Sequence, residues 1–432
     1  MISVALTAAS ARIWFEMALL AECHGWMGKA LAVINPTDRG TRREMLIQTG
    51  FGLSLLFTQG MKSGARAALM RASDLAESLR DLDFQLRTLT GLAIFCRMSD
   101  DLRGGLVLSR RAEAIARDMP DPVAIATADC LLSSSLFWCG EFPAALTYAQ
   151  QAIRQSTPVV RRTHIVRSGY DHLVHSRVTV AQVLWLQGRL DQSQQAAREV
   201  LADAEADSHP VSLCYALTWV GCTISLKLGD LETAAHSITR LKDHAEKHAS
   251  SSYYAGALGF EGQLSVKRGD LATGERLLRT SLVGLRQAQY QMLYTEFLGD
   301  LAEVLMISGQ LDEGLAAADE AVQRIERSGG LWWLPEALRI KGEVQSLSDN
   351  SLITAAADNF RQSLDLAQSQ GALLWELRSA MALGRLYDTQ GRTHDASSLL
   401  GSVYQRFTEG FDAPDLQSAK RLLEDWGSAT SN

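Results

Sequence analysis

Apolar residues recur along this chain at the spacing of helices rather than that of strands. After Gly309 the apolar positions are Leu311, Leu315, Ala318, Ala321, Val322 and Ile325. After Gly188 they are Leu190, Ala196, Ala197, Val200 and Leu201. Residues three, four and seven positions apart lie on one face of an α-helix, whereas a strand alternates at every second residue. We therefore expect an all-α protein built from amphipathic helices.

Short turns separate these helices at a nearly constant interval. The clearest turns begin at Gly140, Gly188, Gly229, Gly269, Gly309 and Gly391, looser ones at Gly60, Asp100 and Asn350, and a degenerate one near Leu20. Successive turns lie 40 or 41 residues apart, except for one interval of 48 residues. Glycine readily takes the positive φ angle that ends a helix, and a polar residue after it can cap the next helix. The constant interval indicates an internal repeat.

Each repeat is predicted to be a helix–turn–helix pair of about 40 residues. One pair cannot bury its apolar face alone, so the pairs are expected to stack into a right-handed α-solenoid of about ten repeats. We expect a single continuous superhelix over residues 1–426. The long interval predicts an irregular insertion at about residues 155–170, and residues 427–432 are predicted to be a frayed tail.

Glycines and small residues at this spacing resemble tetratricopeptide repeats (TPRs), although the interval exceeds the 34 residues of the shortest form. It resembles the longer repeats in the sensor regions of bacterial signal-transduction ATPases. The stretches 294–305, 335–343 and 370–380 are similar to the C-terminal half of large bacterial regulators. Those regulators carry a winged-helix DNA-binding domain or an adenylate cyclase domain, followed by an NTPase module.

The resemblance implies a cytoplasmic, non-catalytic interaction or sensor module. Such a module binds a protein, a peptide or a small effector on its concave face. Because this chain has no Gly-x-x-x-x-Gly-Lys-Ser/Thr loop, which an NTPase needs to hold phosphate, an NTPase, cyclase or DNA-binding effector would have to be a partner in trans. Alternatives are a truncated remnant of a larger regulator, and an enzyme with an unrecognised site near 161–177. The sequence offers no catalytic residue and no cofactor motif.

Composition narrows these possibilities. With 42 basic and 49 acidic residues the net charge is −7, so direct nucleic-acid binding, which needs a basic surplus, is not expected. No apolar run reaches the roughly 20 residues of a membrane helix. The six cysteines lie in apolar stretches without a CxxC pair, as reduced core thiols do.

The basic residues around the long interval are the first binding candidate. Arginine presents planar donors that suit carboxylate or phosphate, so these side chains could line a pocket for a small anionic effector. The alternative is a solvated loop whose charges pair with neighbouring helices. The candidate residues are Arg161, Arg162, His164, Arg167, His172 and Arg177.

Aromatic residues near the starts of successive first helices are the second candidate. They could form a stripe along the concave face, where solenoids bind partners, or pack between repeats. The residues are Tyr253, Tyr254, Tyr290, Tyr294, Trp332 and Trp333.

Other polar side chains suggest structural roles. The pairs His172–His175 and His244–His248 have helical spacing, but no third ligand is evident, so we expect no metal site. Glu376 and Arg378 are two residues apart, too close in sequence to face each other on a helix, and we expect them to bridge to adjacent helices.

Overall fold

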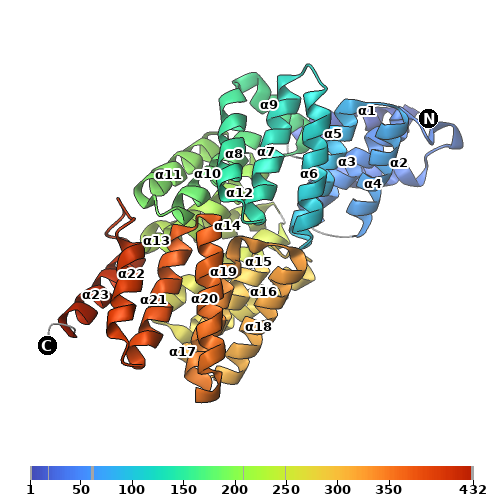
Figure 1. The fold of residues 1–432 in the computed structure, drawn as a ribbon. Helices are drawn as coiled ribbons and strands as arrows, with labels where there is room; N and C mark the ends of the chain where they lie inside the picture. Colours follow the sequence, from blue (N-terminus) through green and yellow to red (C-terminus); the bar gives the residue numbers. More distant parts are fainter. Residues whose placement is uncertain (1, 18, 60–62, 208, 249, 430–432) are drawn as a thin grey trace.

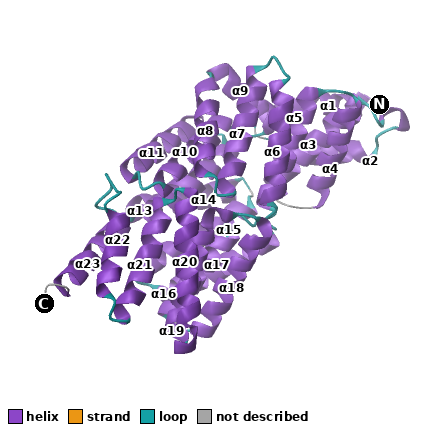
Figure 2. Ribbon diagram, viewed as in Figure 1, coloured by secondary structure: helices purple, strands orange, loops and turns teal. Residues whose placement is uncertain are grey.

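The computed structural model describes residues 2–17, 19–59, 63–207, 209–248 and 250–429. Within these ranges all regular structure is helical and no strand occurs (Figure 2). Ten helix–turn–helix pairs follow one another there and stack into a right-handed, TPR-like α-solenoid (Figure 1). The repeat fold expected from the sequence is confirmed.

We term the first helix of each pair the A helix and the second the B helix. The A helices are α1 (Ile2–Glu16), α3 (Arg42–Gln59), α5 (Leu82–Met98), α7 (Pro122–Trp138), α10 (His172–Leu186), the composite α12–α13, α15 (Ser251–Lys267), α17 (Tyr294–Ile307), α19 (Leu334–Ser348) and α21 (Leu373–Thr389). The B helices are α2 (Leu20–Ala32), α4 (Ser63–Ser78), α6 (Leu102–Arg117), α8 (Phe142–Gln155), α11 (Leu190–Asp207), α14 (Leu231–Lys247), α16 (Leu271–Gln287), α18 (Leu311–Ser328), α20 (Ile353–Gln370) and α22 (Thr393–Tyr404). The composite helix joins α12 (Pro210–Ala216) to α13 (Thr223–Leu228) through a π-helical turn at Leu217–Cys222. Short 3-10 turns lie at Pro36–Asp38, Leu331–Trp333 and Asn350–Leu352.

Two further helices lie outside the ten pairs and correct the prediction. The segment expected to be an irregular insertion at 155–170 forms helix α9 (Pro158–Ser168). The Thr157 side chain accepts a hydrogen bond from the backbone N–H of Val160, and proline fits the first turn of a helix. Helix α23 (Pro414–Ala429) includes the first three residues of the predicted frayed tail; residues 430–432 lie outside the described residues.

Most turns between A and B helices have the expected backbone geometry, but Asn350 does not take a positive φ and instead begins a 3-10 turn capped by Asp349. The turn glycines have positive φ at Gly140, Gly188, Gly229, Gly269, Gly309 and Gly391, and Asp100 takes the same conformation at φ 70°. The aspartate that follows Gly229 or Gly269 accepts a hydrogen bond from the third residue beyond it, which caps the B helix. The predicted turn residue Gly60 lies outside the described residues.

The A helices form the interior of the solenoid and the B helices its outer layer. Almost every side chain of α7 between Val123 and Trp138 is buried. The B helix α14 instead buries a single stripe that includes Ala234, Leu241 and Ala245. A helix that is apolar on all sides must be covered on all sides, so the A helices need a second layer besides their own B helices.

Successive turns of the superhelix supply that second layer. Trp138 at the end of α7 packs edge-on against Trp332 before α19, with ring centroids 5.2 Å apart. Trp185 of α10 contacts Trp375 of α21 in the same way at 4.8 Å. In Figure 1 the green helices of the N-terminal half accordingly lie beside the C-terminal half (yellow to red), whereas the blue helices α1–α4 lie away from it. We term this contact between the two halves the inter-turn seam.

One helical segment passes the length and composition test for a membrane span. The composite helix over 210–228 has a mean hydropathy of 1.4, but 83% of it is buried inside the fold. Its apolar surface is covered by neighbouring repeats, so the segment is a core helix of the solenoid.

Candidate functional site

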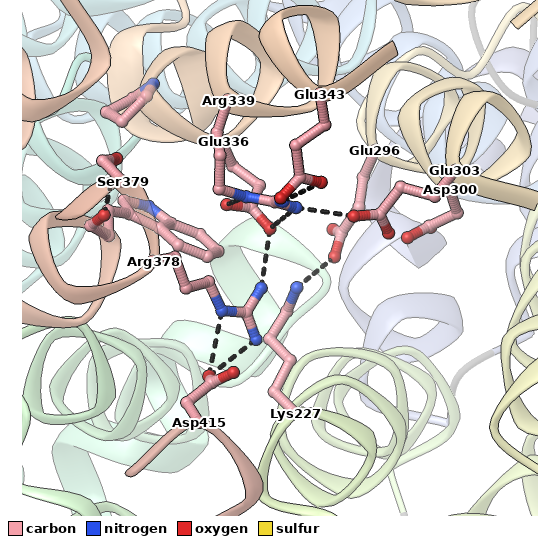
Figure 3. Close-up of polar contacts among 12 residues, drawn as sticks. Lys227, Glu296, Asp300, Glu303, Glu336, Arg339, Glu343, Arg378, Ser379 and Asp415 are labelled. Carbon is pink, nitrogen blue, oxygen red and sulfur yellow. Dashed lines mark hydrogen bonds and ion pairs between the residues drawn. The ribbon is translucent and has the colours of Figure 1, made fainter. Parts of the chain in front are cut away.

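Charged side chains from four A helices and α23 meet on the inner side of the C-terminal half (Figure 3). Arg378 of α21 donates to Glu336 of α19 at 2.6 Å and to Asp415 of α23 at 2.9 Å. Arg339, one turn beyond Glu336, pairs with it at 2.8 Å and with Glu303 of α17 at 2.5 Å. We term this set, together with Lys227, Glu296 and Glu343, the inner network. It ties non-adjacent repeats together through ion pairs.

The inner network is buried, which strengthens each of its interactions. The side chains of Arg339 and Glu336 are 9% and 5% exposed. Burial alone would raise the pKa of Glu336, but the guanidinium groups of Arg339 and Arg378 outweigh it and lower that pKa to about 2. The Glu336 carboxylate is therefore ionised at neutral pH. Lys227 of α13 pairs with the buried Glu296 of α17 at 2.7 Å.

A cavity of about 130 Å³ opens beside this network. Its wall includes Lys227, Lys267, Asp300, Trp333 and Arg378. Burial and the neighbouring carboxylate of Glu296 raise the pKa of Asp300 to about 8.

Two groups in the cavity wall stand apart from the ion pairs. Asp300 accepts a hydrogen bond from the side-chain amide of Gln263 at 2.5 Å. Burial and the nearby Arg378 lower the pKa of Lys267. Neither Lys267 nor Asp300 makes an ion pair within the part of the chain that the structure describes. The cavity thus offers one cation donor and one carboxyl acceptor to a ligand.

The structure does not bring the six predicted basic residues into one pocket. Arg161 pairs with the buried Asp171 at 2.5 Å, Arg162 pairs with Glu16, and Arg177 pairs with Asp203. Arg161 and Arg162 border a pocket of about 670 Å³ between α1, α9 and α12, whereas Arg167 faces a different pocket. Pairing with neighbouring helices, the alternative drawn from the sequence, describes most of these charges.

The predicted binding histidines lie in the core and cannot reach a ligand in solution. His164 and His172 are 1% and 2% exposed, and their rings stack with centroids 4.1 Å apart. Burial lowers the pKa of His164 to about 4 and that of His172 well below its usual value. Both imidazoles are neutral at pH 7 and serve packing.

The candidate aromatic residues do not form an exposed stripe but pack between repeats, the second of the two alternatives drawn from the sequence. Tyr253, Tyr294, Trp332 and Trp333 are 8%, 2%, 6% and 3% exposed, and Tyr254 is partly buried. The curvature of the solenoid places these rings between repeats or in the inter-turn seam rather than on an open groove.

Sequence reasoning missed most of the inner network, although a signal for it exists. The expectation that Glu376 and Arg378 bridge to adjacent helices is confirmed, since Glu376 accepts a hydrogen bond from Gln368 of α20 and Arg378 pairs with Glu336 of α19. The signal is a charged residue inside an otherwise apolar A helix. Glu296 in α17 is an example among the remaining residues of the inner network. No group of three His, Cys, Asp or Glu side chains in the described residues is arranged to hold a metal ion.

Comparison with known proteins places the chain among helical repeat proteins. No protein-family model matches it. An uncharacterised protein of Rhizobium meliloti (strain 1021) is 26% identical over 224 residues, which are 52% of this chain and 22% of that protein. The chain therefore spans well under two thirds of the relative that it matches.

Two solved structures illustrate the likeness in fold. A Rap protein in complex with competence and sporulation factor superposes with a TM-score of 0.58 at 14% identity, covering 89% of this chain and 99% of that chain. A signal-transduction ATPase with a tetratricopeptide repeat sensor from Pyrococcus horikoshii gives 0.45 at 11% identity, covering 89% of this chain and 55% of that one. The first likeness shows that the chain has a TPR-like fold.

Proposed function

We propose that this chain is a cytoplasmic, non-catalytic TPR-like interaction and sensor module of a bacterial signalling or transcription-regulatory system. Its partner is a protein that presents a peptide segment to the inner side of the superhelix. The fold supports this role because helical solenoids display binding residues on their inner surface. The Rap structure, which contains competence and sporulation factor, is an example of such a fold with a bound factor.

The mixed charge of the inner cavity is the observation that carries the proposal. Asp300 is half-buried in the cavity wall and Lys267 lies at its solvent-exposed edge. Neither has an ion-pair partner in the described residues, so both side chains are available to a ligand. A peptide segment carries both an N–H donor and a carbonyl or carboxylate acceptor along its length, and so matches this pair.

The size of the cavity limits what can enter. A volume of about 130 Å³ accommodates a side chain or a chain terminus, but not a folded domain. The inter-turn seam closes the rest of the interior around Trp138 and Trp332. The partner therefore inserts one or two residues, while its folded part remains outside.

Affinity capture with matched variants tests this function. The immobilised full chain should recover from lysate a partner that bears an NTPase, cyclase or DNA-binding domain. The double variant Lys267→Gln, Asp300→Asn should bind that purified partner about tenfold more weakly or worse, since the interactions of the Lys267 ammonium and the Asp300 carboxyl group are both lost. Titration calorimetry measures the affinity.

The matched control is Lys247→Gln, Asp243→Asn on the exposed face of α14, which should bind like the wild type. Circular dichroism should show unchanged helix content in both variants. Recovery of no partner above background, or equal affinity of the two double variants, would contradict the proposal.

A further inference from the structure

Four arginines from four helices surround one pocket at the N-terminal end of the superhelix. Arg12 of α1, Arg42 of α3, Arg87 of α5 and Arg167 of α9 line a pocket of about 360 Å³, and the one carboxylate in its wall is Asp83. Figure 1 shows these helices grouped at the N-terminal end of the molecule. The whole chain has a net charge of −7, so the positive charge of this pocket is opposite in sign to that of the molecule.

Internal ion pairs balance most of this positive charge, and Arg12 is the arginine of the four that has no ion pair in the described residues. Asp83 is shared, since it pairs with Arg87 at 2.6 Å and lies 3.5 Å from Arg167. Arg12 lies near Glu16, but Arg162 already binds the Glu16 carboxylate. The two remaining acids lie outside the wall: Asp121 binds Arg167 at 2.9 Å, and Asp81 binds Arg42. Within the pocket itself four guanidinium groups face one carboxylate.

Burial of Arg87 increases the free-energy cost of the excess positive charge. Its Nε atom is buried and has no hydrogen-bond partner in the described residues. Burial and the positive charge of Arg167 lower the pKa of Arg87, although the pairing with Asp83 opposes them. An arginine nevertheless stays protonated in proteins. An anion among these groups would relieve the repulsion and accept the unused N–H.

The ring of Phe84 in the pocket wall holds the side chains of two of the arginines in place. The guanidinium carbon of Arg87 lies 4.6 Å from the centre of the Phe84 ring, and that of Arg42 lies 5.4 Å from it. Stacking on a ring holds the planar fork in place. Phe15 and Leu46 add apolar surface to the same pocket. The pocket therefore combines a rigid cationic part with an apolar part.

Helix α9 shows why the pocket exists only in this repeat. It lies outside the regular pairs, packs against α1 and α5, and contributes Arg167 and Thr163 to the wall. The larger pocket on the other side of α9 has two arginines, Arg161 and Arg162, and one carboxylate, Glu16, in its wall. The extra helix thus completes a pocket whose wall carries four guanidinium groups and one carboxylate.

We propose that the pocket formed by Arg12, Arg42, Arg87 and Arg167 binds a small organic phosphate ester. The dianionic phosphate has three terminal oxygens and so accepts from several guanidinium forks at once, while the body of the ester packs against Phe15 and Leu46. The volume lies within the range of small-molecule sites. This site is separate from the inner cavity and extends the proposed interaction module to an effector-binding one.

Titration calorimetry on the purified full chain tests the proposal with phenyl phosphate as the probe. Saturable binding is expected at low salt and should weaken as salt increases, because the contacts are charged. Inorganic phosphate should bind at least about tenfold more weakly, since it lacks the apolar body. Succinate, a dicarboxylate without the phosphate geometry, should also bind more weakly.

Variants decide whether the binding is at this pocket. Arg12→Gln should reduce the affinity for phenyl phosphate about tenfold, and it breaks no ion pair within the described residues, so the fold should persist. Arg87→Gln should reduce it further. Arg198→Gln, on the exposed face of α11, is the matched control and should bind like the wild type. The assay needs no protein partner, so its result is independent of the capture experiment.

Three results would overturn the assignment. The first is the absence of saturable phenyl phosphate binding at millimolar concentration in low salt. The second is unchanged affinity in Arg12→Gln and Arg87→Gln while both remain folded by circular dichroism. The third is equal affinity for inorganic phosphate and phenyl phosphate, which would exclude an organic ester as the preferred ligand.

Discussion

Buried histidines are the single residues whose charge the fold controls most strongly. His172 stacks against His164 and Tyr170, with centroid distances of 4.1 and 4.4 Å. Neither ring nitrogen of His172 has a hydrogen-bond partner in the described residues. Burial lowers the pKa of His172 well below its usual value. The folded protein therefore holds this imidazole neutral at a pH where the unfolded chain protonates it.

The substitution His172→Phe should reduce the sensitivity of the fold to acid. In the wild type, stability is complete above the unfolded histidine pKa of about 6.5 and falls as the pH drops below it, because the unfolded chain then binds more protons. Phenylalanine keeps the ring stacking but cannot titrate. Between pH 7 and pH 5 the variant should lose about 2 kcal/mol less unfolding free energy than the wild type.

Urea unfolding at several pH values measures this difference. The exposed His394→Phe substitution in α22 is the control and should leave the pH dependence unchanged. Parallel stability profiles for His172→Phe and the wild type would show that His172 is not held neutral by the fold.

At the scale of helices and turns, the repeat pattern predicts most elements but not their irregularities. Helix α9 carries recognisable signals, a Thr157 cap followed by Pro158 and ended by Gly169, yet it falls outside the repeat interval and so reads as an insertion. The π-helical turn at Leu217–Cys222 has no comparable signal. It depends on how Trp219 packs against Trp138, with centroids 4.9 Å apart.

The same limit applies to the candidate sites. Helical spacing shows that Arg378 must bridge to other helices, and it pairs with Glu336 and Asp415 as expected of such a residue. It does not show that Lys227 joins them, because that depends on the curvature of the solenoid. The periodicity of the sequence predicts the helix face on which a side chain lies. The curvature of the superhelix determines which residues that face contacts.

Two turn glycines have the same backbone conformation but different surroundings. Replacing each with alanine therefore separates the free energy of straining the turn backbone from that of crowding the inter-turn seam. Gly188 and Gly391 have φ angles of 77° and 75°. A Cβ at Gly188 would lie 2.6 Å from Phe407 and overlap it, whereas a Cβ at Gly391 would meet nothing within 4 Å. Gly391→Ala should therefore cost about 1–2 kcal/mol for the backbone alone. Gly188→Ala should cost about 1–3 kcal/mol more from overpacking.

Thermal and urea unfolding of both variants at neutral pH measures this comparison. Equal destabilisation by the two substitutions would show that the seam at Phe407 rearranges around the new methyl group without a loss of stability.

At the scale of the whole molecule, the inter-turn seam distinguishes this protein from an open solenoid. In an open solenoid each repeat contacts only its neighbours, so stability is the sum of local terms. Here Trp138 and Trp332, 194 residues apart in the chain, are in contact, and Gln291 donates a backbone hydrogen bond to Met98 at 2.9 Å. These contacts couple the N-terminal repeats directly to the C-terminal ones. The repeat pattern of the sequence does not predict these contacts between distant repeats.

Removing a seam tryptophan should therefore divide the molecule into two unfolding units. Trp332→Ala deletes the contacts with Trp138 and Phe137 and should cost about 3–5 kcal/mol, as for other large-to-small substitutions in cores. Because the lost contacts join the two halves, hydrogen exchange should show the N-terminal repeats opening at a lower free energy than the C-terminal ones, whereas the wild type opens both together. Trp26→Ala on the exposed side of α2, where 53% of the residue is accessible, should leave the exchange pattern of the seam unchanged. If the wild type already exchanges as two independent halves, the seam does not couple them and the superhelix behaves as a chain of local repeats.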